Sequence, residues 1–272
     1  MSAASTSPVR VEPTHGGRVA RVILARPEVR NAFDDVLVKA LQRVIRALSS
    51  DGVVRVIELS GEGKSFCAGA DLNWMKRMAG FTMEENRRDA AELADLFRLL
   101  DECPKPIVGR IHGAALGGGT GLVAICDVAV AAEGTLFGTT EVRLGIIPAV
   151  ISPYVVRKIG ESHAREWFLT GSRRDAHEAR RAGLVHIVAA EASLVSVTEG
   201  VIDALLLGGP QALAEAKKLA QVVSHLPARE LQTLTVQRIA ERRASAEGRE
   251  GVKAFLEKRS PAWAEGEKGP KT

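Results

Sequence analysis

The sequence predicts an α/β fold that begins with alternating strands and helices and ends in helices alone. Two short runs rich in β-branched residues, 19–24 and 53–59, flank a stretch whose apolar positions follow helical spacing. The alternation of helices and strands then recurs between residues 84 and 132. After about residue 155 the strand signals nearly stop. Together these patterns indicate an α/β core followed by a helical segment.

The expected elements can be placed in chain order. Strands are expected at 19–24, 53–59, 106–111 and 128–132. Helices are expected at 33–48, 84–100, within the glycine-rich segment 111–127, and at 162–170, 176–182, 192–207, 211–223 and 229–247. The stretch "LGGPQ" marks the best division. It separates a core with the active site, residues 1–207, from a helical segment, residues 208–272.

Composition excludes several classes of protein. With 272 residues and 46% hydrophobic residues, the chain can bury a sizeable core. The net charge of +4 arises from mixed acidic and basic residues, and only 4% of residues are aromatic, so we do not expect nucleic acid as a partner. Three widely spaced cysteines indicate a reducing compartment. No stretch reaches the roughly 20 apolar residues of a membrane span, and the chain start has no apolar run, so we expect a cytoplasmic protein.

The segment "IHGAALGGGTGLVAICD", residues 111–127, is unusually rich in glycine. Glycine costs conformational entropy, so its use suggests a close approach to the backbone, next to the unpaired N–H groups that begin a helix. A dinucleotide fingerprint fits poorly, because "HGAAL" separates the strand from the glycines and Glu141 lies nine residues beyond the next strand. A phosphate-binding loop would need a Lys that is absent. Simple packing of the helix on a strand remains the alternative.

Two further segments favour a catalytic site. The loop "SFCAGADL", residues 65–72, also consists mainly of small residues and follows a buried strand. The segment "FGTTEVRLGIIP", residues 137–148, places the single carboxylate of Glu141 before an apolar run. Two backbone loops and one acid are the parts needed to polarise a carbonyl group and to move a proton next to it.

These segments, with the terminal "GVKAFLEKR", resemble the crotonase superfamily, the enoyl-CoA hydratase/isomerase family, from about residue 10 to residue 262. The resemblance implies a crotonase-like spiral of ββα units with a C-terminal helical trimerisation region. It implies a homotrimer or a dimer of trimers, and an acyl-CoA substrate whose thioester oxygen accepts hydrogen bonds from the N–H groups of Ala70 and Gly118. Coenzyme A would enter as part of the substrate, with no metal and no other cofactor.

The resemblance also implies which residues bind coenzyme A. The loop containing Arg26, Asn31 and Ala32, together with the backbone at Ala68, would contact the pantetheine and the nucleotide. Near the end of the chain, Phe255 and Lys258 would reach the adenine side of a neighbouring subunit.

One position departs from the pattern of the family's hydratases. They generally use two glutamates, but here only Glu141 matches, and Gly121 stands at the other position. The segments "AGADLNWMKRM", "GGGTGLVAICD" and "IPAVISPYVVRKIG" look most like the methylglutaconyl-CoA hydratases of bacterial leucine breakdown. We therefore expect a branched, carboxylated enoyl-CoA substrate whose own carboxylate partly replaces the missing glutamate. Lys76, Arg77 or Arg143 would hold it.

Other polar residues near these loops favour structural roles. Asp127 is expected to accept a backbone hydrogen bond, Asp71 to cap a short helix and His112 to pack or hydrogen-bond. Cys67 lacks an evident base partner for nucleophilic catalysis. Two alternatives to a hydratase, a carbon–oxygen lyase, remain open. One is an isomerase or decarboxylase that uses Glu141 alone, and the other is a weakly catalytic CoA- or RNA-binding protein.

Overall fold

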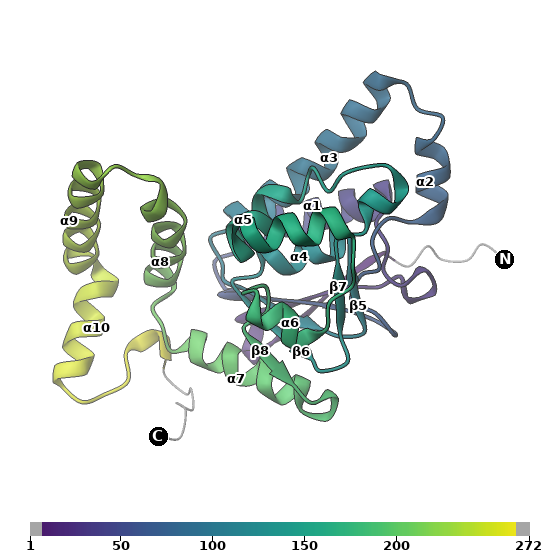
Figure 1. The fold of residues 1–272 in the computed structure, drawn as a ribbon. Coiled ribbons are helices and arrows are strands. Elements are labelled where there is room, and N and C mark those ends of the chain that lie inside the picture. The colour runs from purple at the N-terminus through teal and green to yellow at the C-terminus, as the bar shows by residue number, and fades with distance from the viewer. Residues whose placement is uncertain (1–6, 265–272) are drawn as a thin grey trace.

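A computed structural model describes residues 7–264 of the chain. The outer ends of the two predicted segments, residues 1–6 and 265–272, lie outside the described residues. A central sheet is covered by helices on both faces, and three C-terminal helices stand to one side (Figure 1). The predicted α/β class is confirmed.

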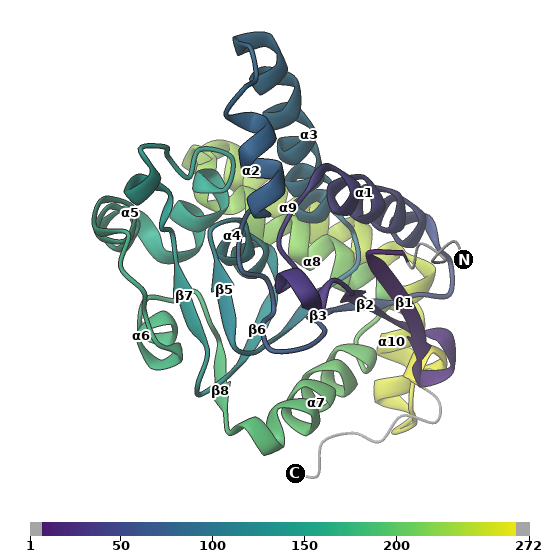
Figure 2. The ribbon, with the colours of Figure 1, turned by 90° about the vertical axis from the view of Figure 1, so that its right-hand side faces the viewer.

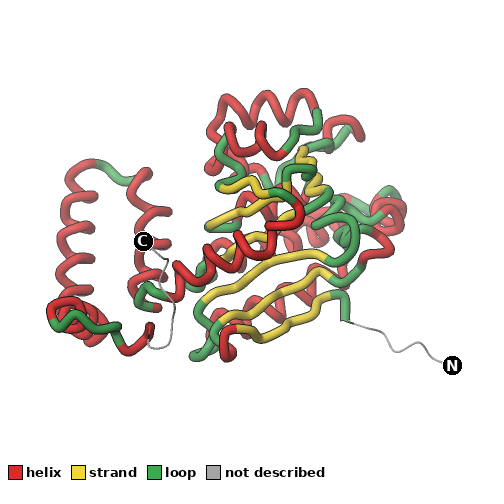
Figure 3. Tube along the Cα trace, turned by 90° about the horizontal axis from the view of Figure 1, so that it is seen from below, coloured by secondary structure: helices red, strands yellow, loops and turns green. Residues whose placement is uncertain are grey.

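The central sheet has six strands in the order β1-β2-β3-β4-β6-β8, and a smaller sheet pairs β5 with β7. Only β1 runs antiparallel to its neighbour, and the other pairs are parallel. The strands are β1 Val9–Thr14, β2 Val19–Leu24, β3 Val56–Gly61, β4 Ile107–Ile111, β5 Ala114–Leu116, β6 Val128–Ala132, β7 Leu136–Gly138 and β8 Ile187–Ala189. Figure 3 shows the long strands side by side.

The chain forms a spiral in which successive turns add a strand to each sheet. Strand β4 is followed by β5, and β6 is followed by β7. Strand β6 pairs with β4 in the central sheet, and β7 pairs with β5 in the smaller sheet, so one turn of the chain extends both sheets. A single parallel bridge between Cys67 and Ala115 extends the smaller layer to the loop after β3. The carboxyl ends of these segments therefore gather at one edge of the molecule.

Helices cover the two faces of the central sheet unequally. They are α1 Asp35–Ser50, α2 Leu72–Met78, α3 Met83–Glu102, α4 Gly118–Ile125, α5 Ser152–Thr170, α6 Ala176–Arg181, α7 Leu194–Leu206, α8 Pro210–Val222, α9 Ala228–Ala244 and α10 Ala246–Leu256. Helix α7 lies under one face, where Ile202 and Leu206 pack on Val19, Val56 and Val108 (Figure 2). The main core lies on the opposite face.

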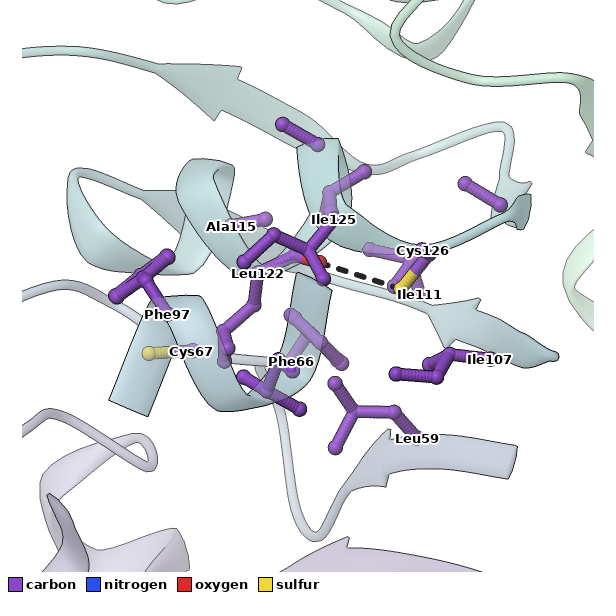
Figure 4. Close-up of a cluster of buried hydrophobic side chains, with 14 of the residues drawn as sticks. Leu59, Phe66, Cys67, Phe97, Ile107, Ile111, Ala115, Leu122, Ile125 and Cys126 are labelled. Atoms are coloured by element: carbon purple, nitrogen blue, oxygen red, sulfur yellow. Dashed lines mark hydrogen bonds between the residues drawn. The ribbon is translucent and has the colours of Figure 1, made fainter. Parts of the chain in front are cut away.

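Helix α4 lies inside the main core. Leu122, Val123 and Ile125 are at most 5% exposed, and Leu122 packs in the cluster that also contains Phe66 (Figure 4). The Cys126 thiol donates a hydrogen bond to the Leu122 carbonyl oxygen and so stays within the helix end. A helix buried in this way has a fixed axis, which fixes the direction of its first N–H groups.

Several expected boundaries were wrong for identifiable reasons. Strand β1 was missed. The helix expected from residue 162 begins ten residues earlier, because Gly160, with φ of 74°, interrupts α5 without ending it. The helix expected at 229–247 ends at Ala244, and Ser245 then caps α10 through a hydrogen bond from the Gly248 N–H.

The C-terminal helices bury little of their own surface. Among the described side chains of α8, α9 and α10, only Ala254 is buried. Within residues 7–264, no helix taken alone is long and apolar enough to cross a bilayer. One pair, Glu191–Leu206 with Pro210–Val222, reaches that size only together and is bent by 104°.

Candidate active site

The loop after β3 is held against the smaller sheet by backbone hydrogen bonds. The Phe66 N–H donates to the His112 carbonyl (2.9 Å), and the Cys67 N–H donates to the Ala114 carbonyl (3.0 Å). The Leu116 N–H returns a hydrogen bond to the Cys67 carbonyl (3.0 Å). This ladder makes the small-residue loop an extension of the sheet and places Ala70 at its end.

Ala70 presents an N–H group without an internal acceptor. In the parallel bridge between Phe33 and Ala70, the hydrogen bonds come from the neighbours of Ala70. The Phe33 N–H donates to Gly69 (2.7 Å), and the Asp71 N–H donates to Phe33 (2.8 Å). The backbone groups of Ala70 itself therefore point away from Phe33. Among the described residues, none accepts a hydrogen bond from the Ala70 N–H.

Gly118 presents the second free N–H group. It is the first residue of α4, so its N–H has no partner within the helix. The preceding Gly117 adopts φ of 52° and ψ of −120°, a conformation suited to glycine. Its N–H donates a hydrogen bond to the Gly138 carbonyl (2.8 Å). The helix dipole adds positive potential at Gly118. The hydroxyl of buried Thr120 donates to the Ala115 carbonyl (2.7 Å) and anchors this first turn.

The two loops lie in van der Waals contact. A Cβ atom built on Gly117 would lie 3.8 Å from the Gly69 Cα. A Cβ atom on Gly118 would lie 2.9 Å from the ring of Phe33, the residue that bridges to Ala70. The free N–H groups of Ala70 and Gly118 thus belong to adjoining turns, as the sequence predicts.

Glu141 reaches the same place from the segment after β7. It begins the 3₁₀ helix Glu141–Leu144, and its Oε1 would lie 3.2 Å from a Cβ on Gly117. Its Oε2 is buried, with no hydrogen-bond partner among the described residues. Burial raises the pKa of Glu141 above the usual 4.5, and a hydrogen bond with its own backbone only partly offsets this. A buried carboxylate with a raised pKa is suited to acid–base chemistry.

The raised pKa predicts that Glu141 lowers stability at neutral pH. The folded state holds the Glu141 proton more tightly than the unfolded chain. The stabilisation that Glu141 gives through this proton is therefore full below the usual pKa of 4.5 and is lost as the pH rises through the folded pKa. We expect Glu141→Gln to raise the melting temperature at about pH 7, and this gain to shrink towards about pH 4.

Calorimetry of the two proteins across that pH range measures the effect, with Glu133→Gln as the control. Glu133 is exposed in the turn after β6, and its variant should follow the wild type. A Glu141→Gln variant that is less stable than the wild type at neutral pH would contradict the assigned direction.

The position of the absent second carboxylate is filled by apolar side chains. A Cβ atom on Gly121 would lie 2.4 Å from Ile151 Cγ2 and 2.7 Å from Phe97 Cε1. A Cβ atom on Gly119 would lie 2.3 Å from the Cys67 carbonyl oxygen. Close packing of α4 on its neighbours therefore explains why Gly119 and Gly121 lack side chains. Close packing of α4 and a free N–H at Gly118 are compatible, so the glycine-rich segment shows both features.

In the predicted coenzyme A loop, the side chains of Asn31 and Arg26 are used within the protein. The side chain of Asn31 is fully buried and donates to the carbonyl groups of Glu62 and Ser65. The guanidinium group of Arg26 donates to the Ala32 carbonyl (2.7 Å). These side chains are used within the protein, so the structure favours backbone contact over side-chain contact at this loop. The Ala68 N–H also has a partner within the protein, because it donates a hydrogen bond to the Arg30 carbonyl (3.0 Å).

Helix α10 lies far from α2 within one protomer (Figure 1). Phe255 belongs to the last turn of α10, and Lys258 lies two residues beyond its end. Phe255 is 82% exposed. The Lys258 N–H donates to the Phe255 carbonyl (3.2 Å), and Lys258 has a φ of 54°. The structure therefore does not bring these two residues together with Ala70 in the same chain.

The structural roles expected for neighbouring residues are confirmed. Asp71 Oδ1 accepts hydrogen bonds from the N–H groups of Asn73 and Trp74 and caps α2. Asp127 accepts a hydrogen bond from the Ile107 N–H (2.7 Å). His112 contacts the Gly63 carbonyl oxygen (2.9 Å).

Cys67 is buried, and burial raises the pKa of its thiol to about 12. The thiol therefore stays protonated at neutral pH, and Cys67 does not supply a nucleophile.

A spiral α/β fold with two free N–H groups and one half-buried carboxylate at its edge defines an enzyme fold of the crotonase type. The family model described as Enoyl-CoA hydratase/isomerase matches residues 14–266. The chain is 40% identical to an enoyl-CoA hydratase structure from Shewanella pealeana, with a TM-score of 0.90 and coverage of 94% of this chain and 96% of the other. It is 37% identical to Pseudomonas aeruginosa AtuE, with a TM-score of 0.90 and coverage of 94% and 99%.

Among curated proteins, 2,3-dehydroadipyl-CoA hydratase of Escherichia coli is 32% identical over 253 residues, 90% of this chain and 94% of that protein. The chain belongs to the enoyl-CoA hydratase/isomerase family. The predictions of the fold and of an enzyme of the enoyl-CoA hydratase type, a carbon–oxygen lyase, are confirmed.

Proposed function

We propose that the protein adds water to the double bond of a branched, carboxylated enoyl-CoA, or catalyses the reverse dehydration. The substrate would be of the 3-methylglutaconyl-CoA and 3-hydroxy-3-methylglutaryl-CoA type. The observation that carries the proposal is the position of Glu141. Its half-buried carboxylate, with one buried and unpartnered oxygen, lies beside Gly117, the residue before the free N–H of Gly118.

In the proposed reaction, the N–H groups of Ala70 and Gly118 bind the thioester oxygen. Glu141 accepts a proton from water as the water oxygen bonds to C3, and the electrons of the double bond move onto the thioester oxygen. The protonated Glu141 then donates that proton to C2, and the thioester carbonyl re-forms. Each fixed donor of this kind typically stabilises the transition state by about 2.7–4 kcal/mol. No metal or separate cofactor takes part, since coenzyme A is carried by the substrate.

The apolar filling beside Gly121 supports a role for the substrate's own carboxylate. With Ile151 and Phe97 in that place, the chain supplies no second acid there to hold the water. Of the three cations expected to hold the substrate carboxylate, Arg77 pairs with Asp35 (2.6 Å). The Arg143 side chain lies against Gly171, at the end of α5.

Lys76 is therefore the best remaining cation for this role. It is exposed on α2, the helix that directly follows Ala70 and Asp71. Within residues 7–264, it has no ion pair or side-chain hydrogen bond. We assign it to the distal carboxylate of the substrate.

A panel of acyl-CoA substrates tests the proposed specificity. We expect kcat/KM for 3-methylglutaconyl-CoA to exceed that for crotonyl-CoA by at least about tenfold, because a charge-assisted contact to the distal carboxylate is worth about 1.5–3 kcal/mol. Lys76→Met should remove most of this preference. Arg77→Met, one residue away and paired with Asp35, should retain it. Absorbance of the conjugated thioester reports the rate. Equal hydration of crotonyl-CoA would contradict the proposed substrate class.

A second candidate function is supported by Ile151 and Phe97, which form an apolar wall beside Gly121. A single carboxylate can remove a proton from C2 of a 3-enoyl-CoA and return it to C4, which moves the double bond to C2–C3 without water. Ile151 and Phe97 would favour this isomerisation by excluding water from their side. A decarboxylase could also use Glu141 alone. Turnover of a 3-enoyl-CoA faster than any hydration would favour the isomerase. No described residue favours the alternative of a weakly catalytic CoA- or RNA-binding protein.

The exposed C-terminal helices support the proposal of a homotrimer or a dimer of trimers. Five large apolar side chains of α9 and α10 are at least half exposed: Val236, Ile239, Val252, Phe255 and Leu256. Apolar side chains gathered on one appendage are typical of a surface that another chain covers. In such an assembly, Phe255 and Lys258 could approach the coenzyme A of a neighbouring subunit.

A further inference from the structure

Arg26 joins the capping aspartates of two different helices. Its Nη2 lies 2.8 Å from Asp34 Oδ2 and 3.2 Å from Asp71 Oδ2. Its Nη1 donates to the Ala32 carbonyl (2.7 Å). The side chains of Arg26, Asp34 and Asp71 are 17%, 15% and 5% exposed. Charge-assisted hydrogen bonds that are shielded in this way are stronger and better ordered than those at the surface.

Each aspartate divides its two oxygens between a helix and Arg26. Asp34 Oδ1 accepts from the Leu37 N–H (2.8 Å) and caps α1, while its Oδ2 faces Arg26. Asp71 Oδ1 caps α2, and its Oδ2 likewise faces Arg26. Burial alone would raise the pKa of Asp71, but the capping hydrogen bonds and the Arg26 charge hold it below its usual value. The carboxylate of Asp71 is therefore held as an anion beside the guanidinium group of Arg26, and Asp34 Oδ2 faces the same Nη2 atom.

Asp71 is the residue next to Ala70. The direction of the Ala70 N–H depends on the peptide plane between Gly69 and Ala70. The Phe33 bridge holds that segment from one side, and the side chain of Asp71 holds it from the other. Asp34 follows Phe33 in the same way that Asp71 follows Ala70. Arg26 thus connects the two strands of the bridge beyond their last backbone hydrogen bond.

We propose that Arg26, acting through Asp71, is a positioning residue that sets the direction of the Ala70 N–H towards the thioester oxygen. This rests on the proposed function, in which that N–H polarises the thioester. Arg26 does not contact the substrate in this scheme. Its guanidinium fork suits the role, because one planar group reaches a carbonyl and two carboxylates, which an ammonium group cannot match in geometry.

Two isosteric variants separate positioning from stability. Asp71→Asn and Asp34→Asn both keep an oxygen that can cap the helix, and each places an amide where a carboxylate faced Arg26. Only Asp71 adjoins Ala70. We expect Asp71→Asn to lower kcat by about 10- to 100-fold with little change in KM, and Asp34→Asn to change kcat by less than about threefold. Arg26→Gln should resemble Asp71→Asn.

The closing experiment measures carbonyl polarisation directly and requires no turnover. A chromophoric cinnamoyl-CoA thioester absorbs at longer wavelength when its carbonyl oxygen accepts strong hydrogen bonds. We expect a red shift on binding to wild-type protein and to Asp34→Asn, and a clearly smaller shift with Asp71→Asn at saturating ligand. Melting temperatures measured in parallel should fall similarly in both variants.

The outcomes are distinguishable. If cinnamoyl-CoA binds to wild-type protein without a red shift of its absorbance, the proposed oxyanion site itself is wrong. If the wild type shows the shift and Asp71→Asn retains it in full, Arg26 does not position Ala70. If kcat simply follows the melting temperature in all three variants, the role of Arg26 is structural only, and the proposal is overturned.

Discussion

Glu141→Gln is expected to lower turnover by about 10²–10⁴-fold, the usual contribution of a general acid–base group. The physical reason is that glutamine keeps the shape and the hydrogen-bonding oxygen of Glu141 but cannot exchange a proton with the substrate. Because the two backbone donors remain, the affinity for an acyl-CoA should change little. Steady-state kinetics and calorimetric titration with a non-reacting CoA thioester measure the two quantities separately.

The pH dependence provides an independent check on Glu141. A base must be ionised in the free enzyme, so kcat/KM should rise with pH through a midpoint above the usual 4.5 of glutamate, as burial requires. The residual rate of Glu141→Gln should lack this rise. Retention of most of the activity by Glu141→Gln would show that another group moves the proton.

Gly121→Glu, which restores the second acid of the family's hydratases, is expected to prevent folding. Its Cβ would lie 2.4 Å from Ile151 and 2.7 Å from Phe97, and overpacking of this kind typically costs about 1–3 kcal/mol or more. The carboxylate would then be buried among apolar groups without a partner, which adds a further cost. Circular dichroism and the yield of soluble protein measure the result.

Gly200→Glu is the matched control. Gly200 is exposed on α7, with no atom within 4 Å of a Cβ at that position, so this variant should fold normally. Ile151→Gly combined with Gly121→Glu should recover part of the folded protein, because the nearest clash is removed. Normal stability of Gly121→Glu alone would mean that Ile151 and Phe97 move aside easily, and that the apolar wall is not a fixed part of the site.

The sequence predicts much of this fold because several of its signals are local. The apolar spacing of α1 and the runs that form β2 and β3 arise within single elements. Long-range pairing decides the rest. The three-residue strands β5 and β7 exist only because they pair with each other. The α5 helix continues through Gly160 in spite of its φ of 74°, which no local pattern indicates.

The candidate site was predictable to the same extent. Ala70, Gly118 and Glu141 lie in motifs that can be read along the chain, and the structure places these motifs together. The apolar wall was not predictable, because Phe97 and Ile151 lie far from Gly121 in the sequence. The two ion pairs of Arg26 were missed for the same reason. The capping sequences at Asp34 and Asp71 were visible, but nothing local indicates that one cation joins them.

The close packing around Gly121 also restricts the routes by which this protein can change. A second acid at this place would require a carboxylate at 121 and a smaller residue at 151, and we expect each change alone to give a less stable protein. Selection for water addition with two acids would therefore meet a barrier that one mutation cannot cross. Under the proposed single-acid mechanism, exposed helices such as α2 can then accept substitutions that the interior around Gly121 cannot.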